Sequence, residues 1–124
     1  QLLATSRELE DRAWRTGRGR LHVGFQRADA FEAQATVYRE LATTDIDVHV
    51  YVPGGVSADV LADSPVTLHT RNGDLERYWF ILFDDGEFGA QNCALIARET
   101  EDGRYQGLWT YNGELVAEAF KTVE

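Results

Sequence analysis

The chain has 124 residues, of which 44% are hydrophobic, and a formal net charge of −9. This length and apolar content suffice for one domain with a hydrophobic core and exclude a disordered chain. The acidic balance argues against binding nucleic acid through its phosphates. No apolar run approaches the roughly 20 residues of a membrane span, so we expect no membrane contact by this fragment. The chain lacks methionine and begins with Gln1, so we expect residues 1–124 to be a single domain excised from a longer chain.

The charged residues are unusual in kind as well as in number. Eleven of the twelve basic residues are arginine, and Lys121 is the only lysine. Acidic, lysine-poor surfaces suit concentrated salt, which screens electrostatic self-repulsion, and this favours a halophilic source. A GC-rich genome, which favours arginine codons, is the alternative. Cys93 is the only cysteine, so an internal disulfide is excluded, which fits a reducing cytoplasm.

Helices and strands alternate in the first half of the chain. Thr5 with Glu8, and Asp29 with Glu32, have the spacing of capping boxes and predict two helix starts. The predicted elements are a helix over 5–15, a strand over 21–26, a helix over 29–42 with Phe31, Ala35, Tyr38, Leu41 and Ala42 on one face, and a strand over 46–52. This order predicts a strand–helix–strand unit with parallel strands.

The second half is predicted to be an antiparallel meander followed by a helix. Residues 78–83 are apolar throughout, which is typical of a central strand covered on both faces. The other predicted elements are a helical turn over 57–61, a strand over 66–70, turns over 71–74 and 84–87, a hairpin around 102–103, and a helix from Asn112 with an apolar stripe of Leu115, Val116, Ala119, Phe120 and Val123. The fold class is therefore α+β: a single mixed or antiparallel sheet of about five to six strands flanked by helices, compatible with a GAF-like three-layer arrangement.

The hairpin has the most informative local sequence. Asp102-Gly103 between two strand-forming runs favours a two-residue turn, because glycine readily takes a positive φ. A two-residue loop sets Arg98 opposite Gly107, with Tyr105 and Trp109 diagonally beside the guanidinium. Gly107 then leaves room for a side chain or for a ligand. The alternative is an ordinary cation–π stack on a sheet face.

Few residues have a pattern that favours catalysis or metal binding. His22, His49 and His69 fall on three predicted strands; three imidazoles can bind zinc, but their spacing does not require it, and we expect no metal. Cys93 has no histidine base nearby in the sequence, so we expect no catalytic residues. The basic loop over 15–20 either binds an anion or is simply solvated.

A ligand pocket is favoured more strongly, by the number of large aromatic side chains. Most must form the core, but those on the sheet face opposite the core helices could line a small-molecule site. The predicted ligand-binding residues are Gln26, Tyr38, Trp79, Arg98 and Trp109. In this site Arg98 would pair with an acidic group of the ligand, and Trp109 would stack on a planar one.

The motifs, taken in order, resemble those of the DICT domain, a sensory module of diguanylate cyclases and two-component systems. The resemblance covers about residues 5 to 123. The motifs that carry it are Gly24-Phe25-Gln26, Phe31 and Tyr38 on the next helix, Tyr78-Trp79-Phe80, Ala94-Leu-Ile-Ala-Arg-Glu99 and Gly107-Leu-Trp-Thr110. It implies a cytoplasmic input domain, similar to those of haloarchaeal signalling proteins, that is linked to neighbouring signalling domains and to light responses.

Two hypotheses for function follow. The first is a non-catalytic signal-input domain that binds a small molecule or chromophore and regulates a histidine kinase or a cyclic-di-nucleotide enzyme. The second is a protein–protein interaction or homodimerisation module with no ligand. An ATP-binding glycine box and a diguanylate-cyclase signature are both missing from this sequence, so we expect the output to lie elsewhere. No motif identifies a cofactor.

Overall fold

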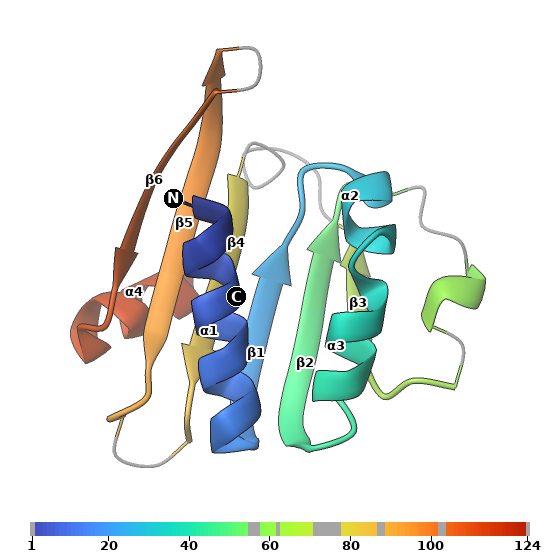
Figure 1. Cartoon of the computed structure of the whole chain (residues 1–124), viewed down its shortest axis with the longest axis horizontal. Helices are drawn as coiled ribbons and strands as arrows, with labels where there is room; N and C mark the ends of the chain where they lie inside the picture. Colours follow the sequence, from blue (N-terminus) through green and yellow to red (C-terminus); the bar gives the residue numbers. More distant parts are fainter. Residues whose placement is uncertain are drawn as a thin grey trace.

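A six-stranded sheet forms the middle layer of the fold, with helices on both faces (Figure 1). The structure is a computed structural model that describes residues 2–54, 58–61, 63–70, 78–86, 89–101 and 104–123. The elements are α1 (Leu2–Thr16), β1 (Arg18–Gly24), α2 (Ala28–Glu32), α3 (Ala35–Leu41), β2 (Asp45–Val52), the 3₁₀ helix η1 (Ala58–Leu61), β3 (Thr67–Thr70), β4 (Tyr78–Asp84), β5 (Cys93–Glu101), β6 (Arg104–Thr110) and α4 (Gly113–Val123). The turn predicted over 71–74 and the dipeptide Asp102-Gly103 lie outside the described residues.

The order of strands in the sheet is β3-β2-β1-β4-β5-β6. The first three strands are parallel to one another, and β4, β5 and β6 are antiparallel. Because β4 pairs with both β1 and β5, it joins the parallel half to the meander and lies in the interior of the sheet. The α+β class, the parallel strand–helix–strand unit and the central apolar strand are thus confirmed.

The larger core lies between the sheet and the helices α1, α2 and α3, which cover the near face in Figure 1. Alternate strand residues point into it, because successive side chains of a strand face opposite ways. The predicted apolar face of residues 29–42 is buried here as expected, although a turn at 33–34 divides that segment into α2 and α3. Full burial of one leucine or phenylalanine side chain stabilises a domain by about 1.5–3 kcal/mol.

The smaller core lies under α4, on the opposite face of the sheet. The Asn112 side chain accepts hydrogen bonds from the backbone N–H groups of Glu114 and Leu115, which confirms the predicted start of this helix. Val116, Phe120 and Val123 are buried, but Leu115 is 55% exposed and was wrongly included in the stripe. The helix therefore buries a narrower face than its sequence suggested.

Two predicted helix caps are wrong. Helix α1 begins at Leu2, so Thr5 lies inside it, and the residue before α2 is Arg27, so Asp29 lies in the first turn. The carboxylate of Asp29 instead pairs with the Arg27 guanidinium. Capping sequences also occur within helices, where helical hydrogen bonds already satisfy the backbone, and spacing alone does not distinguish the two cases.

The acidic turn after β4 is more ordered than its sequence suggested. Asp85 belongs to the predicted turn over 84–87, where side chains are ordinarily solvated, yet it is 3% exposed. Its carboxylate accepts hydrogen bonds from the backbone N–H groups of Gly89 and Gln91. The Asn92 side chain accepts another from the Asp85 N–H. Asp85 thus satisfies loop donors that burial would otherwise leave unpaired.

The register of the β5–β6 hairpin differs by one residue from the prediction over most of its length. Glu101 pairs with Arg104 as expected, but a bulge between Glu99 and Glu101 shifts the pairs beyond it. Arg98 is therefore opposite Gln106, not Gly107. A bulge adds one residue to one strand, so every later pair is displaced by one.

Candidate functional site

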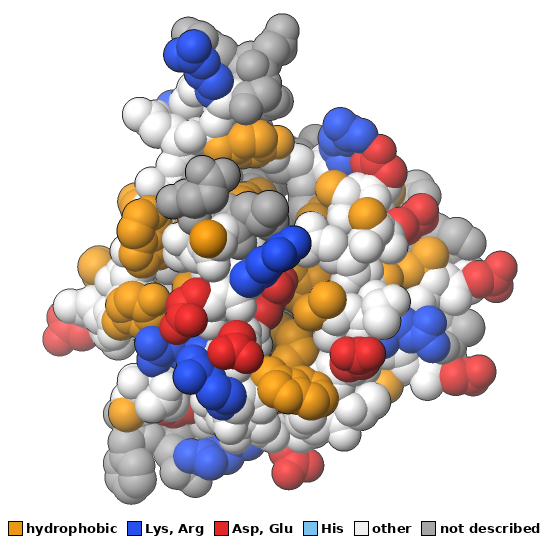
Figure 2. All heavy atoms as spheres, in the orientation of Figure 1, with side chains coloured by type: hydrophobic (Ala, Val, Ile, Leu, Met, Phe, Trp, Pro, Cys, Tyr) orange, Lys and Arg blue, Asp and Glu red, His pale blue; other side chains and the backbone are white. Residues whose placement is uncertain are grey.

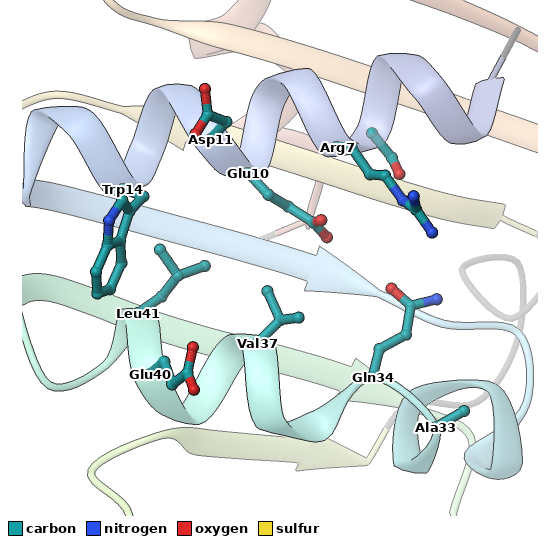
Figure 3. A pocket seen from close by; sticks show the side chains of 10 residues that line it. Arg7, Glu10, Asp11, Trp14, Ala33, Gln34, Val37, Glu40 and Leu41 are labelled. Atoms are coloured by element: carbon teal, nitrogen blue, oxygen red, sulfur yellow. The ribbon is translucent and has the colours of Figure 1, made fainter.

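A groove lies between α1 and α3, on the face of the sheet that α1, α2 and α3 cover, and its volume is about 790 Å³ (Figure 3). Figure 2 shows hydrophobic side chains in this furrow, with acidic side chains on the helices at its sides. The volume is within the roughly 300–1,000 Å³ range of small-molecule sites. Its lining residues are Ser6, Arg7, Glu10, Asp11 and Trp14 on one side, and Ala33, Gln34, Val37, Glu40 and Leu41 on the other. We call this hollow the α1–α3 groove.

A hydrogen bond connects the two helices beside the groove. The Tyr38 hydroxyl of α3 donates to Glu10 Oε2 of α1 at 2.5 Å. Burial raises the pKa of the Glu10 carboxyl above its ordinary value, against the opposing effects of the Tyr38 hydroxyl and the Arg7 guanidinium. Burial and the nearby Glu10 raise the pKa of Tyr38 well above its ordinary value, so the phenol stays protonated and donates.

The groove presents apolar surface next to carboxylates. Trp14 is 50% exposed and Val37 is 39% exposed, and Figure 3 places them on opposite sides of the groove. Glu10, Asp11 and Glu40 supply three acidic groups, against the single arginine Arg7. Such a groove suits a ligand that has an apolar or planar body and a donor or cationic group, since the indole can stack and the carboxylates can accept hydrogen bonds.

The structure does not bring the five predicted ligand-binding residues into one pocket. Tyr38 is buried under the α1–α3 groove and acts there through Glu10. Trp79 packs partly buried against the larger core, and Gln26 lies in the segment after β1. Arg98 and Trp109 lie on β5 and β6, in the other half of the sheet.

Arg98 and Trp109 lie on opposite faces of the sheet, so their predicted juxtaposition is wrong. Trp109 pairs with Leu95, whose side chain belongs to the larger core on the α1 side. Arg98 pairs with Tyr78, which packs against the smaller core on the α4 side. Directly paired residues share a face. The cation–π stack predicted for Arg98 therefore cannot involve Trp109.

Two other arginines make cation–π contacts. The Arg12 guanidinium lies 4.5 Å from the centre of the Tyr111 ring, and that of Arg20 lies 4.1 Å from the centre of the Phe120 ring. The second contact connects β1 to α4. Such contacts contribute about 0.5–1 kcal/mol when exposed and more when desolvated.

The basic loop predicted over 15–20 is not a loop throughout, because β1 begins at Arg18. Its charges are also matched by carboxylates. Arg15 pairs with Asp11 at 3.4 Å, and Arg20 pairs with Asp84 at 3.3 Å. These pairs reduce the attraction for an external anion, so the geometry favours the solvated alternative.

A row of histidines on β1, β2 and β3 was only partly foreseen. The sequence placed His22, His49 and His69 on separate strands, and the sheet brings them side by side on the α4 face. His49 Nδ1 lies 2.8 Å from His69 Nε2, and its Nε2 lies 2.9 Å from the Asp47 carboxylate. Within the described ranges, no group of three or more histidine, cysteine or acidic residues has an arrangement able to hold a metal ion.

His22 differs from the other two histidines because it is buried. Its ring is 3% exposed, its Nδ1 lies 2.9 Å from the Tyr51 hydroxyl, and its ring lies edge-on to Phe120. Burial lowers the pKa of His22 from 6.5 to about 4, with smaller contributions from nearby positive groups. The imidazole is therefore neutral at pH 7. Outward-facing histidines on a strand are ordinarily solvated. Here α4 covers this face of the sheet and buries His22.

Cys93 is a buried thiol in the larger core. Burial raises its pKa to about 12. Because the thiolate is the reactive form, this thiol is not poised to act as a nucleophile at neutral pH. Its place in the core is that of a small hydrophobic residue.

The fold is an α+β domain with a six-stranded sheet and a groove between two of the helices that cover one face of it. The chain matches the family DICT, described as "Sensory domain in DIguanylate Cyclases and Two-component system", over residues 1–100. It belongs to this family. The match ends before the Gly107–Thr110 motif, so all of β6 and all of α4 lie beyond it. No significant match was found among curated proteins or among solved structures.

Among the described helices, none has the length and apolar content required to cross a membrane.

Proposed function

We propose that this chain is a non-catalytic signal-input domain in which the α1–α3 groove binds a small molecule. The observation that carries the proposal is a groove of ligand size with a partly buried carboxyl group and an accessible indole. The family description supports a sensory role. The output would be a histidine kinase or a cyclic-di-nucleotide enzyme in a neighbouring domain, and the signal a metabolite or a light-related chromophore.

The groove has a direct route to a conformational readout. The Glu10–Tyr38 hydrogen bond is a polar connection between α1 and α3, and the Glu10 carboxylate also lines the groove. A ligand that hydrogen-bonds this carboxylate competes with, or reinforces, the contact that sets the spacing of the two helices. It shifts the equilibrium between two helix arrangements only by the difference in its affinity for them.

The chemistry of the groove is tested with a matched pair of probes, tryptamine and its neutral analogue tryptophol. We expect tryptamine to bind more tightly than tryptophol, because its ammonium group can pair with Glu10. Glu10→Gln should weaken tryptamine binding by up to about tenfold and leave tryptophol binding unchanged, since a charge-assisted hydrogen bond is lost. Chemical-shift changes in two-dimensional NMR spectra give both the affinities and the location.

Glu114→Gln is the matched control, because Glu114 is an exposed carboxylate of the same type on α4, across the sheet. It should leave both probes unaffected. The preference for tryptamine should also decline as pH falls through the raised pKa of Glu10, because the protonated acid no longer attracts a cation. Equal binding of the two probes to all variants, or shifts confined to the other face, would refute the groove assignment.

A second candidate function is self-association, and it is favoured by the exposed edge of β6. This strand is the last in the sheet, so its outer backbone groups pair with no strand of the described sheet. It carries large apolar side chains in solvent: Tyr105, Leu108 and Trp109 are 48–60% exposed. Such an edge can pair with the same edge of a second copy and extend the sheet.

Sedimentation velocity tests this association. If β6 forms the interface, the protein should dimerise with concentration, and Leu108→Glu should abolish the dimer. Leu68→Glu is the matched control, because Leu68 is a 40% exposed leucine on the opposite edge strand β3. A monomer at every protein and salt concentration would rule this candidate out, and it would leave the ligand-binding proposal intact.

The proposal includes a setting for the domain. The acidic, lysine-poor composition supports a protein adapted to high salt. The nucleotide substrates of the proposed output enzymes support a cytoplasmic location. Residues 1–124 would form a single sensory domain of a larger signalling protein, with its terminal helices α1 and α4 next to the neighbouring domains.

A further inference from the structure

A second pocket lies on the other face of the sheet, between α4 and strands β4 and β5. Its volume is about 390 Å³, which is near the lower end of the range for small-molecule sites. Its floor includes Tyr78, Phe80 and Ile96, and Ala119 and Val123 of α4 form a wall. We call it the α4 pocket. Its lining is almost entirely apolar, so a ligand body that enters it must be apolar as well.

One cation stands next to this apolar surface. Arg98 pairs directly with Tyr78 across the β4–β5 ladder, so the two side chains share the α4 face. Arg98 is exposed, whereas Ile96, two residues earlier on the same face, is half-buried and lines the pocket. The face therefore changes from apolar to cationic along β5. Among the residues that the structure describes, no carboxylate pairs with Arg98.

The positive charge of Arg98 is unusual in this acidic protein. The chain carries a net charge of −9, so its overall field repels anions. Three other arginines are matched: Arg12 and Arg15 pair with acidic residues of α1, and Arg20 pairs with Asp84. A guanidinium that pairs with none of the described carboxylates, next to an apolar hollow, is complementary to a carboxylate attached to an apolar body. Guanidinium binds carboxylate through two parallel hydrogen bonds.

We propose that the α4 pocket binds a small anionic amphipath, with its carboxylate at Arg98 and its apolar body between Phe80, Ile96 and α4. This site is on the sheet face opposite the α1–α3 groove and is independent of the function proposed for that groove. A ligand in the α4 pocket contacts both the sheet and the C-terminal half of α4. Binding therefore holds that half of the helix against the sheet. In this site Arg98 pairs with an acidic group of the ligand, as the sequence predicted, but the ligand does not stack on Trp109.

Three probes of equal chain length test the site: octanoate, 1-octanol and octylammonium. Two-dimensional NMR titrations of the full chain report affinity and location together. We expect octanoate to shift the signals of Phe80, Ile96 and Ala119, and to bind at least about tenfold more tightly than octylammonium, since a charge-assisted contact replaces a repulsive one. Octanol should occupy the same residues with intermediate affinity.

Substitutions test separately the contribution of the Arg98 charge and that of the apolar α4 pocket. Arg98→Gln should weaken octanoate about tenfold and leave octanol unchanged. Arg104→Gln is the matched control, because it removes an exposed arginine of the same hairpin beyond the bulge, away from the pocket lining. Ala119→Phe should fill the pocket and abolish binding of both probes; Arg98→Gln decides the case if that variant does not fold.

Three outcomes would overturn the proposal. One is equal affinity for octanoate and octylammonium. Another is octanoate binding that Arg98→Gln and Arg104→Gln weaken equally, which would indicate a general charge effect. The third is a set of signal changes located at the α1–α3 groove and missing from β4, β5 and α4. None of these results depends on the tryptamine experiment, so the two sites stand or fall separately.

Discussion

Gly24→Ala is expected to destabilise the domain by about 3 kcal/mol, the upper end of the range for overpacked sites. A Cβ at Gly24 would lie 1.9 Å from Cε2 of Phe80, with two further ring atoms within 2.5 Å. Phe80 is 2% exposed and lies directly opposite Gly24 across the β1–β4 ladder. The ring is held by the smaller core, so it cannot move aside cheaply.

Urea denaturation of the wild type and variants measures this effect. Gly113→Ala is the matched control, because a Cβ there meets no atom within 4 Å and Gly113 lies in the first turn of α4. It should be neutral or slightly stabilising, since alanine favours helix more than glycine does. In the double variant Gly24→Ala/Phe80→Leu, the smaller side chain should recover part of the loss. An effect below about 0.5 kcal/mol would show that the ring is not held as described.

Acidification from pH 7 to pH 4 should remove about 3 kcal/mol of stability through His22 alone, and about 2 kcal/mol by pH 5. The pKa of His22 is about 4 in the folded domain and 6.5 ordinarily. Between these values the unfolded chain binds a proton that the folded domain does not, so unfolding is favoured as pH falls. The contribution is fully present well above pH 6.5, is lost progressively as pH falls through 6.5 toward 4, and stops changing only well below pH 4.

Other charged groups also affect the pH dependence of stability, so the effect of His22 must be measured against a His22 variant. His49, His69, Arg20 and Asp47 all influence its pKa, and burial is the largest cause of the shift. Glu10, whose pKa is raised, works in the opposite direction, because its contribution is present at low pH and is lost as pH rises. Subtracting a variant therefore isolates His22.

His22→Gln supplies that subtraction, since the amide stays neutral and can still hydrogen-bond Tyr51. Urea midpoints measured from pH 4 to pH 8 should decline more steeply below pH 6.5 in the wild type than in His22→Gln. Parallel curves for the two proteins would show that His22 is protonated in the folded domain at the same pH as in the unfolded chain. That result would contradict the buried, neutral imidazole.

Much of the fold could be predicted from local pattern. Residues 46–52 alternate apolar and polar and form β2, whose apolar members point into the larger core. The uniformly apolar run of β4 occupies an interior position of the sheet, as its two buried faces require. Asn112 caps α4. Each of these depends on side chains within a few residues, so the sequence contains the necessary information.

The candidate sites could be predicted far less well. Tyr38 was among the predicted ligand-binding residues, but its partner Glu10 lies 28 positions earlier, and no local spacing connects them. The burial of His22 also depends on an element distant in sequence, because its ring packs against Phe120 of α4. A polar side chain has the same pattern whether its face is solvated or covered by another layer.

The sequence by itself determined the α+β class, which two segments pair in the β5–β6 hairpin, and which residues are available for binding. Tertiary structure alone decided which of those residues meet. Side chains alternate with a period of two along a strand, so the one-residue bulge before Glu101 was enough to place Arg98 on the α4 face and Trp109 on the α1 face. Sheet order then brought three histidines together, and the packing of α1 on α3 made the groove.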